Sequence, residues 1–169
     1  MKIKKAIYPG TFDPITLGHL DIIGATAQIM DELVVAVLCN SQKAPVFSAQ
    51  ERIDMIVSQT KDIPNVTVRA FDGLLVDLAK EEEASFIIRG LRAVTDFEYE
   101  MQMTHVNKAL YPEIHTIFMA ASLQHSYISS SIVREIAAYG GDISNFVTED
   151  VAKLVNSKLN KQQHWRKDE

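Results

Sequence analysis

The chain has 169 residues, of which 47% are hydrophobic and 23% are charged, as is typical of one globular domain. Its formal net charge of −5 argues against a general nucleic-acid binder, and its longest apolar run, at 33–39, is too short to span a bilayer. Its one cysteine, Cys39, cannot form an internal disulfide, which suits a reducing compartment. We therefore expect a cytoplasmic protein that engages neither nucleic acid nor membrane.

Short apolar runs alternate with helical patterns along the chain. The run at 32–38 lacks polar alternation, which is typical of a strand covered on both faces. Ser48 with Glu51, and Thr95 with Glu98, have the spacing of a capping box and predict two helix starts. In chain order, the predicted elements are strand 3–8, helix 17–30, strand 32–38, helix 48–61, strand 66–71, helix 74–83, strand 85–90, helix 95–110, strand 114–119, helix 130–140 and helix 148–160.

Five strands interleaved with helices predict an α/β fold with a doubly wound, five-stranded parallel sheet and C-terminal helices. We expect one domain over 1–160 and a polar tail at 161–169. In such sheets, ligands bind beyond the carboxyl ends of the strands, near the switch in strand order. The loops to inspect for chemistry are therefore 9–18, 89–95 and 120–130.

The first of these loops predicts a phosphate site at a helix N-terminus. Pro9 and Gly10 are predicted to turn the chain sharply. Thr16 is a natural N-cap, and His19 then falls at the third helical position, with its side chain leaning back toward the N-terminus. Unpaired N–H groups and the helix dipole favour an anion there, and a histidine can donate to the same anion. The alternative is that Thr16 only caps and His19 only packs.

The second loop places two guanidinium groups beyond a buried strand. Placing the charged side chains of Arg89 and Arg92 at the end of a buried strand costs free energy unless an anion binds them. The alternative is an internal ion-pair cluster with Asp96, Glu98 and Glu100. Glu100 is also a candidate to hold a ribose or an adenine edge.

The third loop carries Ser129, Ser130 and Ser131 immediately before a helix. Three hydroxyls with free N–H groups predict a second phosphate cradle, whereas capping alone needs only one serine. Lys43 follows the strand at 32–38 and would lie beside the first loop, although most such lysines are merely solvated.

Other common chemistries have no signature in the sequence. There is no GxxxxGK[ST] or GxGxxG motif, and the cysteine and histidines lack zinc-site spacing. The GxSxG motif of serine hydrolases is also absent.

Three segments carry a resemblance to a known family. GTFDPITLGH (10–19) resembles the T/HxGH signature of the nucleotidyltransferase superfamily. Together with RGLRAVTDFEYE (89–100) and YISSSIVRE (127–135), it closely resembles the bacterial phosphopantetheine adenylyltransferases. The resemblance runs over roughly 3–160 and implies a Rossmann-like nucleotidyltransferase fold.

The resemblance also implies a reaction. The phosphate of 4′-phosphopantetheine attacks the α-phosphorus of ATP in line, with Mg²⁺ assisting. Dephospho-coenzyme A forms and pyrophosphate leaves, in the penultimate step of coenzyme A biosynthesis. A homohexamer and feedback inhibition by coenzyme A are implied in the same way.

Site residues carry over position by position. His19 is expected to stabilise the transition state on the ATP phosphates, while Thr11 and Lys43 position the attacking phosphate. Arg89 and Leu75 are expected on the pantetheine side. The chain departs from the family at position 125, where His125 stands and relatives often carry an aromatic residue. The residues expected to hold ATP are Thr11, Phe12, His19, Gly90, Leu91, Arg92, Glu100, His125, Ser126, Tyr127, Ile128, Ser129, Ser130 and Ser131.

Two other functions stay open at this point. A sister enzyme, such as a nicotinate-mononucleotide or glycerol-phosphate nucleotidyltransferase, would share the TxGH motif and the serine-rich loop but not the run at 89–100. A non-catalytic nucleotide-binding module would be expected to have lost His19 or Lys43, and both residues are present.

Overall fold

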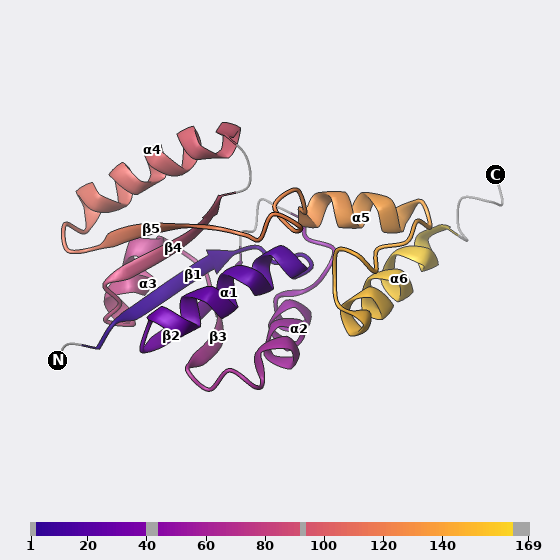
Figure 1. The fold of residues 1–169 in the computed structure, drawn as a ribbon, viewed down its shortest axis with the longest axis horizontal. Helices are drawn as coiled ribbons and strands as arrows, with labels where there is room; N and C mark the ends of the chain where they lie inside the picture. The colour runs from indigo at the N-terminus through magenta and orange to yellow at the C-terminus, as the bar shows by residue number, and fades with distance from the viewer. Residues whose placement is uncertain (1–2, 40–43, 92–93, 164–169) are drawn as a thin grey trace.

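A computed structural model describes residues 3–39, 44–91 and 94–163, which form a five-stranded sheet flanked by helices (Figure 1). The strands are β1 (Lys5–Gly10), β2 (Glu32–Leu38), β3 (Val66–Phe71), β4 (Phe86–Leu91) and β5 (His115–Ala120). The helices are α1 (Leu17–Ile29), α2 (Ala49–Thr60), α3 (Leu75–Glu81), α4 (Val94–Leu110), α5 (Ser130–Ala138) and α6 (Glu149–Gln163).

The strand order is β3-β2-β1-β4-β5, and every neighbouring pair is parallel. The predicted doubly wound parallel sheet is therefore confirmed. The chain runs outward from β1 to β3 and then returns to the other side of β1 with β4. The switch in strand order thus lies between β1 and β4, and the loops that follow these two strands flank the crevice where such folds bind ligands.

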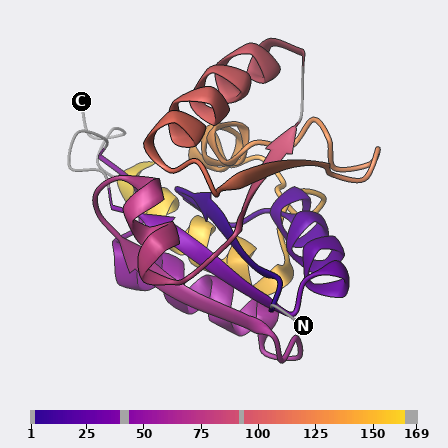
Figure 2. The same ribbon diagram turned by 90° about the vertical axis from the view of Figure 1, so that its left-hand side faces the viewer.

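Alternate residues of a strand point to opposite faces of the sheet, and a buried core lies against each face. Tyr8 and Val35 belong to the larger core, which also contains buried residues of α1, α2, α5 and α6. Ile7 and Val34 belong to the smaller core, which contains Leu78 of α3. In the view turned by 90°, α1 and α3 accordingly lie on opposite sides of the sheet (Figure 2).

Helices α5 and α6 lie together at one end of the molecule, beyond the carboxyl ends of the strands (Figure 1). Val133 of α5 and Val155 of α6 are fully buried in the larger core. These two helices therefore extend the larger core past the sheet.

The predicted sharp turn at Pro9 and Gly10 is wrong, because both residues belong to β1 and pair with Ala36 and Val37 of β2. Pairing of β1 with β4 is confined to Ala6 and Ile7, so the strand resembles an edge strand at Pro9, where proline is tolerated. The chain turns later, at Phe12, whose φ is 50°.

Other boundaries differ by a few residues, as helix and strand ends commonly do. The predicted capping box at Ser48 is present: its side chain accepts from the backbone N–H of Glu51, and Glu51 accepts from the backbone N–H of Ser48. Helix α4 begins at Val94, and the side chain of Thr95 lies outside the described residues, so the predicted cap there stays a prediction. Helix α6 continues to Gln163, beyond the predicted end at 160. In the part of the chain that the structure describes, no helix has the length and apolar character needed to cross a membrane.

Candidate active site

A cavity of about 710 Å³ lies where β1 and β4 end, beside the first turns of α1 and α5. Its volume is in the range of small-molecule binding sites. Residues from all three loops that the sequence singled out line this cavity. Among the predicted site residues, those that line it are Thr11, Phe12, His19, Arg89, Gly90, Glu100, His125, Ile128, Ser129, Ser130 and Ser131.

Thr16 and His19 form a reciprocal cap at the start of α1. Thr16 is buried, and its hydroxyl accepts a long hydrogen bond of 3.4 Å from the backbone N–H of His19. In return, Nδ1 of His19 accepts from the backbone N–H of Thr16 at 3.0 Å and lies 2.9 Å from the Thr16 hydroxyl. A backbone amide can only donate, so Nδ1 carries no proton and Nε2 carries the proton of the neutral ring.

The first turn of α1 offers fewer free N–H groups than a bare helix end. Leu17 donates its N–H to the carbonyl of Phe146 at 2.9 Å, and that of His19 faces the Thr16 hydroxyl. The N–H of Gly18 has no acceptor within the helix, and Gly18 lines the cavity. The anion site at this helix therefore rests on Gly18 and His19 together with the dipole.

Phe12 lines the cavity next to His19. Its ring is buried and lies edge-on to His19, with 5.0 Å between the ring centroids, and edge-on to Tyr8 at 5.4 Å. A Cβ atom added at Gly10 would lie 2.7 Å from the tip of the Phe12 ring. Gly10 is therefore needed for close approach of this ring and not for a turn.

The serine run at the start of α5 has three different sets of contacts. Ser129 is the N-cap, and its hydroxyl accepts from the N–H of Ile132 at 3.2 Å. Ser130 donates its hydroxyl to the carbonyl of Pro14 at 2.8 Å, and Ser131 accepts from Arg134 at 3.4 Å. Ser130 thus fastens α5 to the loop after β1. The first N–H groups of α5 have no acceptor within the helix.

Arg134 and Asp13 are functional candidates that the sequence reasoning missed. Arg134 lines the cavity, donates to the backbone carbonyl of Asp13 and lies 3.4 Å from the Asp13 carboxylate. The carboxylate of Asp13 is buried and also accepts from the N–H groups of Val46 and Phe47, both at 2.9 Å. Asp13 therefore joins three segments around the cavity. The feature that identifies this role is a buried carboxylate that accepts several hydrogen bonds. Burial cannot be read from the sequence.

Arg52 is a second missed residue, and it positions Thr11. Its guanidinium is buried and donates to the carbonyls of Thr11 at 2.7 Å and Leu38 at 3.1 Å. It also donates to the carbonyl of Phe47 at 3.1 Å. The loops that follow β1 and β2 are thereby held together.

Arg89 and Glu100 form an ion pair of 2.9 Å inside the cavity, with each side chain 18% exposed. The internal ion pair that the sequence left open as an alternative is therefore present in part. An ion pair within the wall of a cavity can also orient the arginine for a bound anion.

His125 belongs to the loop between β5 and α5 and is tied to α1. Its Nδ1 lies 2.8 Å from a carboxylate oxygen of Asp21 and 3.1 Å from the hydroxyl of Ser122. The same oxygen of Asp21 accepts from the backbone N–H of Ser122 at 3.1 Å. The loop after β5 is therefore fixed against the second turn of α1.

The remaining predicted site residues lie outside this cavity wall or outside the described residues. Leu75 packs against the smaller core, and Leu91 ends β4. Ser126 donates to the carbonyl of Leu123 at 3.1 Å, and the ring of Tyr127 stands edge-on to Phe146. Lys43 and Arg92 lie outside the described residues. Their predicted ligand contacts stay predictions.

Two described carboxylates line the cavity. Among the side chains that the structure describes, no three histidine, cysteine, aspartate or glutamate residues are grouped as metal ligands. Asp13 and Glu100 line the cavity, and both are already engaged by arginine or backbone N–H groups.

The cavity joins two helix N-termini, a neutral histidine and two arginines. Such groups bind phosphate oxygens by charge and hydrogen bonding. We find among the described lining residues no cysteine, and no serine with a histidine on its hydroxyl. The arrangement favours transfer of a phosphate-containing group by positioning and charge stabilisation.

Comparisons with known proteins agree with this chemistry. A cytidylyltransferase-like family model matches residues 7–136. A phosphopantetheine adenylyltransferase of Lachnoclostridium phytofermentans is 56% identical, covering 94% of this chain and 97% of the relative. The same enzyme of Caldanaerobacter subterraneus is 55% identical, covering 94% of this chain and 99% of the relative.

Solved structures support the fold. A nicotinic acid mononucleotide adenylyltransferase of Plasmodium falciparum, complexed with NaAD, superposes with a TM-score of 0.66 at 15% identity, over 95% of this chain and 96% of that chain. A sequence identity of 15% supports only a shared fold. The two sequence relatives, in contrast, share more than half of the aligned residues with this chain over nearly its whole length. The chain therefore belongs to the phosphopantetheine adenylyltransferase family of nucleotidyltransferases.

Proposed function

We propose that this protein transfers AMP from ATP to 4′-phosphopantetheine, giving dephospho-coenzyme A and pyrophosphate, the penultimate step of coenzyme A biosynthesis. The observation that carries the proposal is the convergence of the α1 and α5 N-termini, His19 and Arg134 on one cavity. Family membership at 56% identity selects this acceptor over that of a sister enzyme.

The phosphate of the acceptor attacks the α-phosphorus of ATP directly, and pyrophosphate leaves from the opposite side. No enzyme nucleophile takes part in this scheme, because positioning and charge stabilisation suffice for such transfers. His19 donates from Nε2 to the phosphate oxygens on which charge develops, since its Nδ1 is occupied by Thr16. Thr11 and Lys43 orient the attacking phosphate, and Arg89 lies on the acceptor side.

Mg²⁺ enters as part of the MgATP substrate in this proposal, shielding the charge of the phosphates. The chain contributes the two helix N-termini, His19 and Arg134 on the nucleotide side. A homohexamer, a cytoplasmic location and feedback inhibition by coenzyme A belong to the same proposal and are supported by family resemblance.

The decisive experiment is a pyrophosphate-release assay with MgATP and either 4′-phosphopantetheine or nicotinate mononucleotide as acceptor. We expect turnover with 4′-phosphopantetheine and none above background with nicotinate mononucleotide. Turnover with nicotinate mononucleotide alone would exclude the proposal in favour of the sister enzyme. Binding of ATP with no turnover on either acceptor would favour the non-catalytic module.

Replacing His19 by alanine tests its role in the transition state. We expect kcat to fall by about 100-fold or more while the Kd for ATP changes by less than about 5-fold, because the contact strengthens as charge develops. Steady-state kinetics combined with calorimetric ATP binding separates the two effects. A Kd that rose by the same factor as kcat fell would instead assign His19 to ground-state binding.

A further inference from the structure

Arg52 is a buried cation behind the wall of the cavity. It belongs to α2 and is only 3% exposed. Arg52 does not itself line the cavity, but its Nη1 donates to the backbone carbonyl of Thr11, which does. A guanidinium group keeps its proton at every pH at which proteins are folded. A full positive charge therefore lies directly behind Thr11.

The hydrogen-bond partners of this charge are backbone carbonyls. The guanidinium donates over 2.7 to 3.3 Å to four of them, those of Thr11, Leu38, Phe47 and Ser48. Among the side chains that the structure describes, no carboxylate forms an ion pair with Arg52. Carbonyl dipoles satisfy the N–H groups, but they carry no net charge that could neutralise a buried cation.

The described arginines and carboxylates that line the cavity form two ion pairs. Arg89 lies 2.9 Å from Glu100, and Arg134 lies 3.4 Å from Asp13. These pairs contain equal numbers of positive and negative charges, so Arg52 adds a positive charge that no described carboxylate balances. Because the charge is buried, water and salt screen it weakly, and it raises the electrostatic potential at Thr11.

We propose that Arg52 stabilises the phosphate of the acceptor through its buried charge and through its hold on Thr11, without touching the ligand. Arg52 is then a positioning residue for the acceptor side of the reaction. The proposal rests on the proposed function, in which Thr11 orients the attacking phosphate. The competing explanation is structural: Arg52 only holds the segments after β1 and β2 against the start of α2.

Two acceptors that differ only in the phosphate separate these explanations. Calorimetry, with displacement titrations where binding is weak, gives the ratio of the Kd values of pantetheine and 4′-phosphopantetheine. This ratio measures the preference of the site for the phosphate. In the neutral variant Arg52→Gln, we expect the preference to fall by about 10-fold, through weaker binding of 4′-phosphopantetheine alone. Equal losses for both acceptors, or an unchanged preference, would overturn the proposal.

Arg52→Lys separates the charge from the hydrogen bonds. Lysine keeps the positive charge, which the surrounding carbonyls favour, but it cannot reproduce the planar fork of donors. We therefore expect both variants to unfold at lower urea concentrations than the wild-type protein. The lysine variant alone should keep the phosphate preference to within about 3-fold. A lysine variant without the preference would overturn the proposal even if the glutamine variant failed to fold.

Arg69→Gln is the matched control because it removes the same charge at a position away from the cavity. Arg69 pairs with Glu81 and Glu82, and it does not line the cavity. We expect this variant to keep the wild-type preference for the phosphate. A loss as large as that in Arg52→Gln would assign the effect to the net charge of the chain and overturn the proposal.

Steady-state kinetics with MgATP and 4′-phosphopantetheine distinguishes failure of this proposal from failure of the proposed function. We expect Arg52→Gln to raise the KM for the acceptor by about 10-fold and to lower kcat by less than about 3-fold, because the charge stabilises the bound acceptor before and during transfer. Wild-type turnover with an unchanged KM in Arg52→Gln would overturn this proposal and leave the proposed function intact. Conversely, a phosphate preference in binding that depends on Arg52 would stand even if the wild-type protein showed no turnover.

Discussion

At the scale of single residues, the state of His19 follows from one local contact. Its Nδ1 lies 3.0 Å from the backbone nitrogen of Thr16, which can only donate, so the ring is neutral and Nε2 is its donor. The hydroxyl of Thr16, 2.9 Å away, restrains the same ring. A side chain that donates along a fixed direction needs no reorganisation when charge develops on a phosphate.

Thr16→Val removes the hydroxyl and keeps the shape of the side chain. We expect kcat to fall by about 3- to 10-fold, because His19 keeps its backbone donor but loses its contact with the hydroxyl. The free energy of unfolding should fall by about 1 kcal/mol through loss of the cap. Thr16→Ser should restore both quantities in steady-state kinetics and urea unfolding. A valine variant as active as the serine variant would show that the hydroxyl does not restrain the ring.

At the scale of elements, the site depends on how α1 and α5 are held with their N-termini at the same cavity. Ser130 donates to Pro14, and Arg134 donates to the carbonyl of Asp13, so α5 is attached to the loop that leads into α1. On the other side, Asp21 of α1 accepts from Ser122 in the loop that leads into α5. Each helix start is therefore positioned by the loop that precedes the other.

Gly18→Ala tests this arrangement, since two effects oppose each other. Alanine is favoured over glycine in a helix by about 1 kcal/mol. The added Cβ would lie 3.1 Å from the backbone oxygen of His125, however, so the loop after β5 must move. We expect the free energy of unfolding to change by less than about 1 kcal/mol while the Kd for ATP rises several-fold. Gly24→Ala is the control, because a Cβ there meets nothing within 4 Å and should leave ATP binding unchanged.

At the scale of the whole molecule, one cluster of ion pairs lies away from the cavity. Beside the amino end of β1, Lys5 lies 2.8 Å from Glu82, which also pairs with Arg69 of β3. The hydrogen bond from Lys5 lowers the pKa of Glu82 below its ordinary value of 4.5, although burial opposes this shift, and Arg69 lowers the pKa further. None of these three residues lines the cavity.

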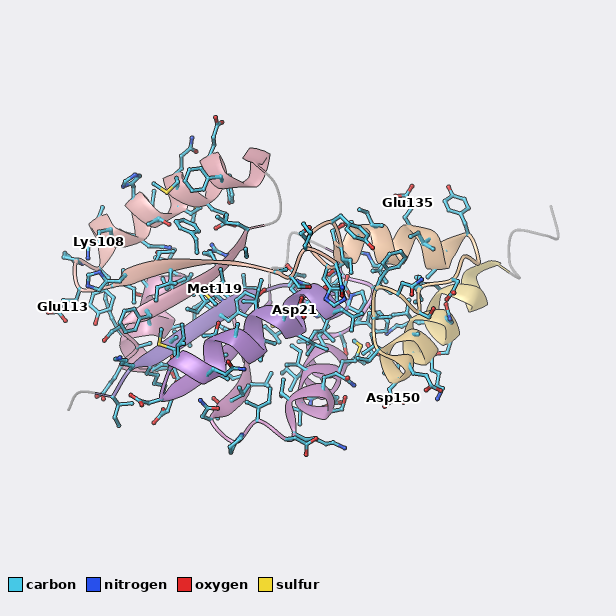
Figure 3. The ribbon with its side chains drawn as sticks, viewed as in Figure 1. Asp21, Lys108, Glu113, Met119, Glu135 and Asp150 are labelled. Carbon is cyan, nitrogen blue, oxygen red and sulfur yellow. The ribbon has the colours of Figure 1, made fainter. Side chains whose placement is uncertain are left out.

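Glu82→Gln should therefore change stability and not activity. A carboxyl whose pKa is lowered on folding stabilises the protein above its unfolded pKa and ceases to do so as pH falls through the folded value. We expect a loss of about 1 kcal/mol at pH 7, shrinking as pH falls below about 4.5, with kcat unchanged. Urea unfolding at several pH values measures this, with the exposed Glu113→Gln (Figure 3) as control. A loss that stayed constant down to pH 3 would argue against the ion pairs as its cause.

Features that depend on near neighbours in the chain could be predicted from the sequence. The alternation of apolar runs predicted the parallel sheet, and the spacing of Thr16 and His19 predicted the cap at α1. The cap forms within one helical turn, and each strand appears in the sequence as a run of apolar residues, so both signals are present in residue order. Pro9 and Gly10 were misjudged as a turn because their tolerance in β1 depends on the absence of β4 pairing beside them.

By itself, the sequence determined the fold class, the family and three of the segments that meet at the cavity, because motifs and periodicity are properties of residue order. Only the tertiary structure decided which side chains complete the site. Ser130 meets Pro14 across 116 positions, and His125 meets Asp21 across 104. The Asp13 carboxylate and the Arg52 guanidinium are positioned by burial among backbone groups from several loops. Such contacts form only when packing brings distant segments within hydrogen-bond distance, and no local pattern records them.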